Sequence, residues 1–511
     1  MWTGALFALL AATASIPLGA PIFPAQDGPV HLYYVDALRG ILTHSAPYAQ
    51  HFRIKSILTP YALEYYSLLA LEFVFSPVFS EKLLIAGYIL AFGLGFRYLV
   101  EAVAAPGSPW ALAAIPFCLH TLVYMGFLNY STAVALLLFQ CGFWIRYSDK
   151  LTPGRVAILI GGLALMLVTH PVPVAVFLMF AGVYLLADAA HEAATGNSWR
   201  KCLSARWGPL VLTAAMGVIA LVWVGLFWKP GASGAHDRSF AQTWGWFNAI
   251  ATELQLYPVA AFSHLSYRAG PILLLAFACV ALLAGLRRNR RNLRPAVTAL
   301  LASSAACFLL YGFVPMRVNG SFYFDDRFPI LWMLFLLAGT AGLRLPRSWS
   351  IVAGGLAAAV TAGLLWQQRA NVSEIASRIA LVEQLPPAKP GSVGLIVSPN
   401  RDVPDGLQFN PYMWCAVHYF QRSQAFLAND PWMDLPQIML RPIHPTRWSY
   451  LDPDDANGPF IRSIVDRTSG TDFDFVMQMG SPDFEVDNLM RHSGWRCDSP
   501  ADSLLRIYRR E

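Results

Sequence analysis

Apolar stretches of about 20 residues recur along the first 370 residues, and no other feature constrains the fold more. A helix of about 20 residues crosses the hydrocarbon core of a bilayer, where every backbone polar group must be paired internally. Candidate spans lie at residues 2–20, 60–76, 82–100, 109–125, 128–146, 156–170, 172–188, 208–228, 270–286, 296–315, 328–344 and 350–367. The sequence therefore predicts a polytopic α-helical membrane protein with about 11–13 transmembrane helices.

The composition changes near residue 370. Charged residues make up 13% of the whole chain, against about 25% in soluble proteins, and the deficit is confined to the earlier part. This predicts a transmembrane domain over residues 1–369 and an extracytoplasmic α/β domain over residues 370–511. In the second domain we expect strands at 393–398 and 473–477, a helix at 483–492, and a closing hairpin formed by 495–497 and 503–508.

Basic residues gather in short clusters between the apolar stretches. The clusters are Arg146, Lys150 and Arg155; Arg200, Lys201 and Arg206; Arg287, Arg288, Arg290, Arg291 and Arg294; and Arg344 with Arg347. This pattern is typical of cytoplasmic loops, so the net charge of +6 indicates membrane topology and not a nucleic-acid partner. With these clusters inside, the turn at His170 and the C-terminal domain lie outside.

Two candidate spans conflict with this topology. Five spans precede residue 146, which is the wrong parity for an N-terminus on the inside. We expect that either 60–76, with Glu64 and Glu72, or 109–125, with two prolines, does not cross. The seven cysteines form no CxxC motif. Cys415 and Cys497 can pair if their domain is outside the cytoplasm, and the sequence leaves this open.

The long first loop holds the first candidate for chemistry, Asp27 with His31. If a helix starts here, the two side chains lie one turn apart on the same face and can share a general-base role or a metal. The alternative is that Asp27 caps a helix with Pro29 in its first turn, and the local pattern alone favours this.

Later span ends hold the other candidates. Tyr323 precedes Asp325, Asp326 and Arg327; two carboxylates can bind a divalent cation and an arginine can hold a phosphate, or the cluster can simply anchor the helix end. His170 and Asn129 are candidates for substrate contacts. The alternatives are a histidine satisfied by a carbonyl freed near Pro171 and a helix cap. No Walker loop, GxSxG, HExxH or strand-following GxGxxG motif is present.

The order of these segments resembles the GT-C superfamily of membrane glycosyltransferases, which includes the protein O-mannosyltransferases and the aminoarabinose transferases. Four segments carry the resemblance: QDGPVHLYYVDALRG, GFLNYSTAVALLLF, THPVPV and DDRFPILWMLFLLAG. It implies a GT-C-like fold. It also implies an inverting transfer of sugar from a polyprenyl-phosphate or polyprenyl-pyrophosphate lipid to an acceptor on the outer face, in the bacterial inner (plasma) membrane.

The resemblance also implies residue roles. In such enzymes a first-loop Asp acts as base or metal ligand, and this role would fall on Asp27. From the residues themselves we expect Asp27 and His31 to be catalytic and Asp325 and Asp326 to be candidate metal ligands. The expected substrate-binding residues are His170, Asn129, Tyr323, Arg317 and Arg327. The first loop lacks an adjacent acidic pair, since Asp36 is the next carboxylate, which leaves metal dependence open.

Two other functions fit a membrane protein of this kind. A lipid or glycan transporter would be expected to contain inverted repeats or paired broken helices, and the sequence shows no such symmetry. A non-catalytic scaffold would bind a partner through the external domain. The expected placement of Asp27, His31, His170 and Arg327 on one side of the membrane argues against the scaffold.

Overall fold

A computed structural model describes residues 2–45, 47–227, 261–262, 265–289, 293–314, 324–397, 407–428, 439–442, 473–479, 484–499 and 505–510. The chain divides into two compact units. Unit 1 comprises Met1–Ile16, Ile85–Leu122 and Leu128–Gln368, and unit 2 comprises Pro17–Leu84, Val123–Phe127 and Arg369–Glu511. Helices α1 (Trp2–Gly19), α5 (Pro77–Val103) and α16 (Arg347–Ile379) contribute residues to both units.

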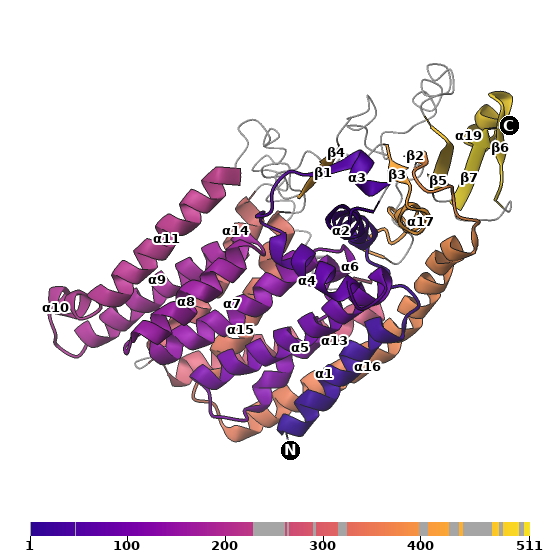
Figure 1. The fold of residues 1–511 in the computed structure, drawn as a ribbon. Coiled ribbons are helices and arrows are strands. Elements are labelled where there is room, and N and C mark those ends of the chain that lie inside the picture. Colours follow the sequence, from indigo (N-terminus) through magenta and orange to yellow (C-terminus); the bar gives the residue numbers. More distant parts are fainter. Residues whose placement is uncertain are drawn as a thin grey trace. The chain divides into compact units, whose positions relative to one another are not determined.

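Unit 1 is built from long apolar helices that pack side by side (Figure 1). Besides the helices shared with unit 2, they are α7 (Leu128–Tyr147), α8 (Pro153–Leu167), α9 (Pro171–Ala193), α10 (Trp199–Ser204), α11 (Trp207–Phe227), α13 (Leu265–Arg288), α14 (Pro295–Phe313) and α15 (Phe328–Ala341). Helix α14 packs against α15 and α9, and α9 also contacts α7, α8 and α11. Within the described ranges, 8 helices are long and apolar enough to cross a membrane. The prediction of a polytopic helical membrane protein is confirmed.

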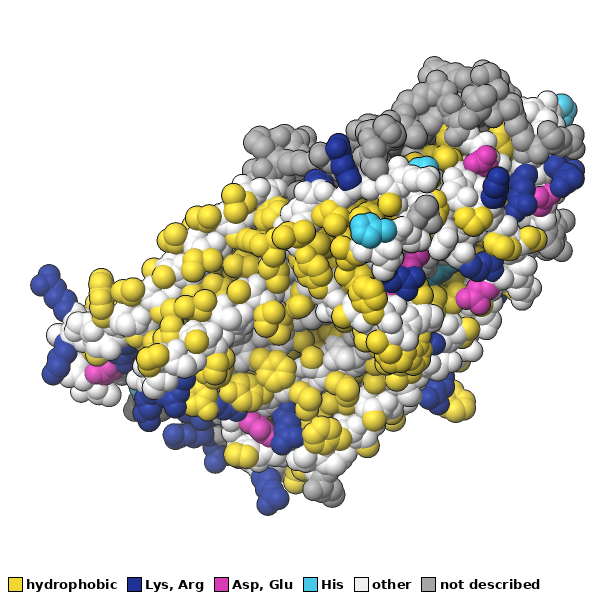
Figure 2. Space-filling view, viewed as in Figure 1, with side chains coloured by type: hydrophobic (Ala, Val, Ile, Leu, Met, Phe, Trp, Pro, Cys, Tyr) yellow, Lys and Arg dark blue, Asp and Glu magenta, His cyan; other side chains and the backbone are white. Residues whose placement is uncertain are grey.

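The outer surface of these helices suits a lipid environment. Figure 2 shows hydrophobic side chains along their sides, with Lys and Arg gathered near helix ends. The basic loops follow α7, α9, α13 and α15 and precede α8, α11, α14 and α16. Because successive helices alternate in direction, these loops lie at the same end of the helices, which agrees with the pattern that the positive-inside rule requires.

The two doubtful spans differ from ordinary transmembrane helices. Residues 60–76 form only α4 (Ala62–Glu72), 11 residues long, which rises about 17 Å and is too short to cross a bilayer. Residues 109–125 form the 3-10 helix η1 (Pro109–Phe117), with Pro116 inside it, and α6 (Thr121–Tyr124). Neither segment is among the 8 helices of the described ranges that are long and apolar enough to cross a membrane.

The C-terminal part of unit 2 contains a five-stranded sheet in the order β3-β2-β5-β7-β6. The strands are β2 (Val393–Val397), β3 (Phe426–Leu427), β5 (Phe475–Met479), β6 (Trp495–Cys497) and β7 (Leu505–Arg510). Strand β2 pairs parallel with β3 and β5, and β7 pairs antiparallel with β5 and β6. The predicted β6–β7 hairpin is therefore confirmed, and β5 begins two residues later than predicted because Phe473 turns into the core.

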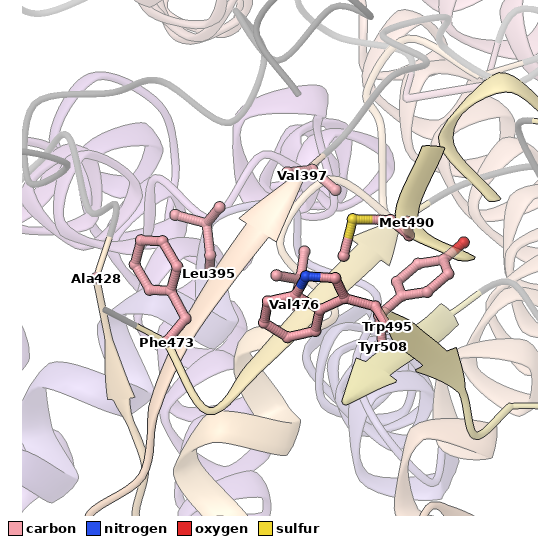
Figure 3. Packing of buried hydrophobic residues seen from close by; sticks show 8 residues of the cluster. All are labelled: Leu395, Val397, Ala428, Phe473, Val476, Met490, Trp495 and Tyr508. Carbon is pink, nitrogen blue, oxygen red and sulfur yellow. The ribbon is translucent and has the colours of Figure 1, made fainter. Parts of the chain in front are cut away.

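One hydrophobic cluster holds this sheet to helix α19 (Phe484–His492). It comprises Leu395, Val397, Ala428, Phe473, Val476, Met490, Trp495 and Tyr508 (Figure 3). Met490 comes from α19, so the helix covers the face of the sheet on which these side chains lie. Cys415 and Cys497 are both free thiols, and Cys415 is buried. They do not form the disulfide that the sequence left open.

The first loop belongs to unit 2 and folds together with the C-terminal residues. It forms α2 (Gly28–Leu42), α3 (Tyr48–His51), β1 (Phe52–Ile54) and α4. Strand β1 pairs antiparallel with β4 (Leu440–Pro442), and α17 (Val417–Ser423) packs against α2. The Tyr33 hydroxyl donates to the Ala425 carbonyl at 3.1 Å and accepts from the Leu427 amide at 3.1 Å.

Candidate functional site

Asp27 stands at the start of α2, where the sequence predicted a helix. Its main-chain carbonyl accepts from the amides of Val30 (3.1 Å) and His31 (3.3 Å), which places His31 one turn along α2. The Asp27 side chain makes no capping hydrogen bond; its Oδ1 accepts from Gln26 Nε2 at 3.4 Å. The predicted spacing is present, and the carboxylate does not serve as the side-chain cap that the local pattern favoured.

His31 is buried against two tyrosines of unit 2. Its Nδ1 lies 3.2 Å from the Tyr65 hydroxyl, and its ring meets that of Tyr61 edge-on with the centroids 6.1 Å apart. Burial lowers the pKa of His31 to about 4, because desolvation penalises the charged imidazolium. The ring is therefore neutral at pH 7, with one nitrogen as donor and the other as acceptor.

Glu81 and Lys82 also lie in this part of unit 2, and the sequence analysis did not predict them as site residues. They lie in the first turns of α5, 2% and 9% exposed. A Cβ built on Gly28 would lie 2.1 Å from Glu81 Oε1, so the carboxylate lies against the first residue of α2. Among the described residues, neither oxygen of Glu81 has a hydrogen-bond partner. Lys82 Nζ donates to the Ala20 carbonyl at 2.7 Å. Adjacent opposite charges at the start of an apolar span were the available signal.

A glycine lets the chain pass close to the start of α2. Gly126 has φ +87°, and a Cβ there would lie 2.8 Å from the Gly28 amide nitrogen and 2.9 Å from Asp27 Cβ. Residues with a side chain rarely adopt this conformation. The Asp27 amide donates to the Met125 carbonyl at 3.2 Å, so the same segment also holds the backbone of Asp27.

A second group of buried charges lies further along α2. Arg39 pairs with the Asp36 carboxylate, and its Nη1 donates to the Glu72 carbonyl at 2.9 Å. The Tyr48 hydroxyl donates to Asp36 Oδ2 at 3.1 Å. Burial, reinforced by the Asp36 charge and opposed by Arg39, raises the pKa of Glu72 to about 8. Burial also raises the pKa of Asp36, against the influence of Arg39 and Tyr48.

Unit 1 brings together three of the predicted site residues, around Tyr130 on α7. The Tyr130 hydroxyl donates to the Arg327 carbonyl, and the His170 ring meets the Tyr130 ring edge-on at 5.3 Å. Asn129 Oδ1 accepts from the Tyr130 amide at 2.6 Å. His170 caps α9, since its Nδ1 accepts from the Val172 amide at 3.2 Å. This bond differs from the carbonyl contact considered from the sequence and places the ring proton of a neutral His170 on Nε2.

The acidic pair of the late span is buried in a 3-10 turn. Asp325, Asp326 and Arg327 form η2 (Asp325–Arg327), which leads into α15, and the Arg327 guanidinium lies 5.4 Å from the Phe324 ring centroid. Over the described ranges, no group of three or more His, Cys, Asp or Glu side chains is arranged to hold a metal ion. Metal binding by Asp325 and Asp326 stays a prediction. Arg317 and Tyr323 lie outside the described residues.

Comparison with solved structures finds 15 matching chains. No protein-family model matches the sequence, and no curated protein matches it. The chain is similar to ArnT. The crystal structure of ArnT from Cupriavidus metallidurans in the apo state matches with a TM-score of 0.48 and 13% identity, covering 99% of this chain and 98% of that one.

Proposed function

We propose that the chain is a glycosyltransferase that moves a sugar from a polyprenyl-phosphate or polyprenyl-pyrophosphate lipid to an acceptor on the outer face of the membrane. The observation that carries this proposal is Asp27. It is a buried carboxylate, 5% exposed, at the end of the segment that follows the first apolar helix. Its side chain does not cap α2, and the buried carboxylate of Glu81 lies against Gly28 at the same helix start.

The chemistry needs a base and a positive charge. The Asp27 carboxylate takes the proton from the acceptor hydroxyl as that oxygen attacks the anomeric carbon of the sugar. The bond between this carbon and the phosphate oxygen breaks, and the electron pair leaves with the polyprenyl phosphate. Lys82, whose ammonium donates to the Ala20 carbonyl in unit 2, supplies positive charge for the departing phosphate. A single displacement of this kind inverts the anomeric configuration.

His31 supports the base and does not replace it. Its imidazole is neutral at pH 7 because burial lowers its pKa to about 4. With Nδ1 facing Tyr65, the ring keeps a fixed orientation one turn from Asp27. A neutral ring adds no charge that would attract the Asp27 carboxylate away from an incoming hydroxyl.

The unit 1 group supplies substrate contacts in this proposal. Asn129 keeps a buried amide nitrogen, Nδ2, with no hydrogen-bond partner among the described residues. Arg327 is 2% exposed and carries a permanent positive charge suited to phosphate. His170 has Nε2–H as its donor. Each of these donors suits the oxygens of a sugar or a phosphate.

The test is transfer of label from a set of polyprenyl-phosphate-linked sugars to the lipid and protein fractions of membranes, by the purified full chain. Asp27→Asn keeps the size of the side chain and should abolish transfer without changing the thermal unfolding midpoint. Glu374→Gln, which removes an exposed carboxylate paired with Arg378, is the matched control and should transfer normally. Full activity in a folded Asp27→Asn variant would refute the assignment of the base. A folded wild type that transfers from no donor, yet moves labelled lipid across liposome bilayers, would favour the transporter.

A further inference from the structure

Three segments that are far apart in the sequence meet at Gln26, the residue before Asp27. The Gln26 amide donates to the Tyr124 carbonyl at 2.8 Å. Its side-chain oxygen Oε1 accepts from the main-chain amide of Asn410 at 2.9 Å. Its Nε2 donates to Asp27 Oδ1 at 3.4 Å. One buried side chain therefore connects the carboxylate of Asp27 to the backbone of the C-terminal part of unit 2.

Stacked aromatic rings hold the same three segments together. The Tyr124 ring stacks on Phe23 at 5.2 Å and on Phe409 at 5.1 Å, with interplanar angles of 22° and 27°. Phe23 and Phe409 are 1% exposed and Tyr124 is fully buried. Stacked rings at these separations are favourable beyond their buried area. The stack fixes the distance over which Gln26 bridges Asp27 and Asn410.

The Asn410 contact decides which way the Gln26 amide points. A main-chain N–H can donate only to the carbonyl end of a side-chain amide, so the amino end must face the other way, toward Asp27. A hydrogen bond donated to a carboxylate favours its ionised form. The orientation of Gln26 therefore favours the charged state that a general base needs.

We propose that Gln26 is a positioning residue for Asp27, and that residues 409–410 act on the reaction through it. This inference rests on the proposed role of Asp27 as the base. The C-terminal residues then do more than cover the first loop: the Asn410 amide sets the orientation of Gln26, and Gln26 sets both the direction and the protonation of the carboxylate.

The experiment is the pH dependence of kcat for transfer from the polyprenyl-phosphate sugar that proves active with the wild type. Gln26→Met preserves the volume and removes both hydrogen bonds of the side chain. The acidic limb of the profile should move to higher pH by about half to one unit, as expected for losing one donor to a carboxylate. At a pH below the limb, kcat should fall by about 3- to 10-fold.

A matched variant separates positioning from simple loss of structure. Gln421 is a buried glutamine of unit 2 whose Nε2 donates to the Leu32 carbonyl at 3.3 Å, so it also ties the C-terminal residues to α2. Gln421→Met should lower the thermal unfolding midpoint and leave the acidic limb where it is in the wild type. An unshifted limb in Gln26→Met, or an equal shift in both variants, would overturn the proposal.

If Gln26→Met does not fold, Gln26→Glu is the variant to measure. A glutamate still accepts from the Asn410 amide but cannot donate to Asp27 when ionised, and its charge repels the carboxylate. The acidic limb should then move further up than in Gln26→Met, and an unchanged limb would contradict the proposal. If Asp27→Asn abolishes transfer while the Gln26 variants keep the wild-type profile, only this inference fails. If Asp27→Asn stays active, the proposed function fails as well.

Discussion

Nδ1 of His31 and the hydroxyl oxygen of Tyr65 lie 3.2 Å apart, where α2 packs against α4. The histidine is 4% exposed. The contact therefore keeps a buried imidazole in one orientation beside the start of α2, and the cost of charging that ring appears in the pH dependence of folding.

The contributions of His31 and His418 to stability should fall as the pH drops from 6.5 to 4. Burial lowers the pKa of His31, and likewise of His418 on α17, from 6.5 to about 4. In this window the unfolded chain binds protons that the folded chain does not, so the free energy of unfolding decreases by up to about 3 kcal/mol for each histidine. His31→Gln should remove the His31 contribution to this dependence, measured by denaturant unfolding at pH 7 and pH 4.5. The exposed His492→Gln should leave it unchanged; a slope unaltered by His31→Gln would contradict the burial argument.

Glu72 should have the opposite effect at higher pH. Its pKa is raised from 4.5 to about 8, so the folded chain keeps a proton that the unfolded chain releases, and stability falls as the pH rises from 4.5 to 8. Glu72→Gln mimics the protonated side chain and should raise the free energy of unfolding at pH 8 by up to about 4 kcal/mol. It should change little at pH 5. Equal effects at both pH values would mean that Glu72 is ionised in the folded chain.

Gly126→Ala should damage the start of α2. The residue would have to keep φ near +87° and place its Cβ 2.8 Å from the Gly28 amide nitrogen, a strain of about 1–3 kcal/mol. We expect lower thermal stability and a larger loss of transfer activity than of stability, because the shifted backbone carries Asp27. Gly182→Ala, on α9 with no atom within 4 Å of the new Cβ, is the control and should be neutral or stabilising. Normal transfer by Gly126→Ala would show that this close approach does not position Asp27.

Tyr33→Phe should loosen the C-terminal residues from α2. It leaves the Ala425 carbonyl and the Leu427 amide without the hydroxyl that they share, at a cost of about 1–3 kcal/mol. Hydrogen exchange should rise at residues 425–428 and stay unchanged in α19. Tyr66→Phe, which removes an exposed hydroxyl that donates to Ile57, is the comparison. Unchanged exchange in Tyr33→Phe would mean that the aromatic packing alone holds these segments.

Local patterns in the sequence predicted local structure well. The start of α2 and the spacing of Asp27 and His31 follow from the proline in its first turn, because neighbours four residues apart share a helix face. Apolar stretches of about 20 residues predicted the long helices. Two short runs around a polar turn predicted the β6–β7 hairpin. Hydropathy marked residues 60–76 as a candidate span, and Glu64 and Glu72 made it one of the two segments expected not to cross. Helix α4 within it has 11 residues.

The rest of the site depends on tertiary contacts that leave no recognisable pattern in a single sequence. Glu81 reaches Gly28 only after α4 has folded back, and no residue spacing records that approach. The Asn410 contact with Gln26 involves a main-chain amide, so the identity of residue 410 carries no signal for it. Strands β1 and β4 have 3 residues each, too few to show an alternating pattern.

The joining of the first loop to the end of the chain sets an order on biosynthesis. Tyr33 leaves the ribosome early, and Ala425, which accepts its hydrogen bond, follows 392 residues later. Contacts across such separations form slowly, and chains fold from the N-terminus as they are made. The segment with Asp27 must therefore wait for its C-terminal partners while all the long membrane helices are inserted. A chain that stopped after α16 would contain every one of those helices and still be unable to complete the surroundings of its own first loop.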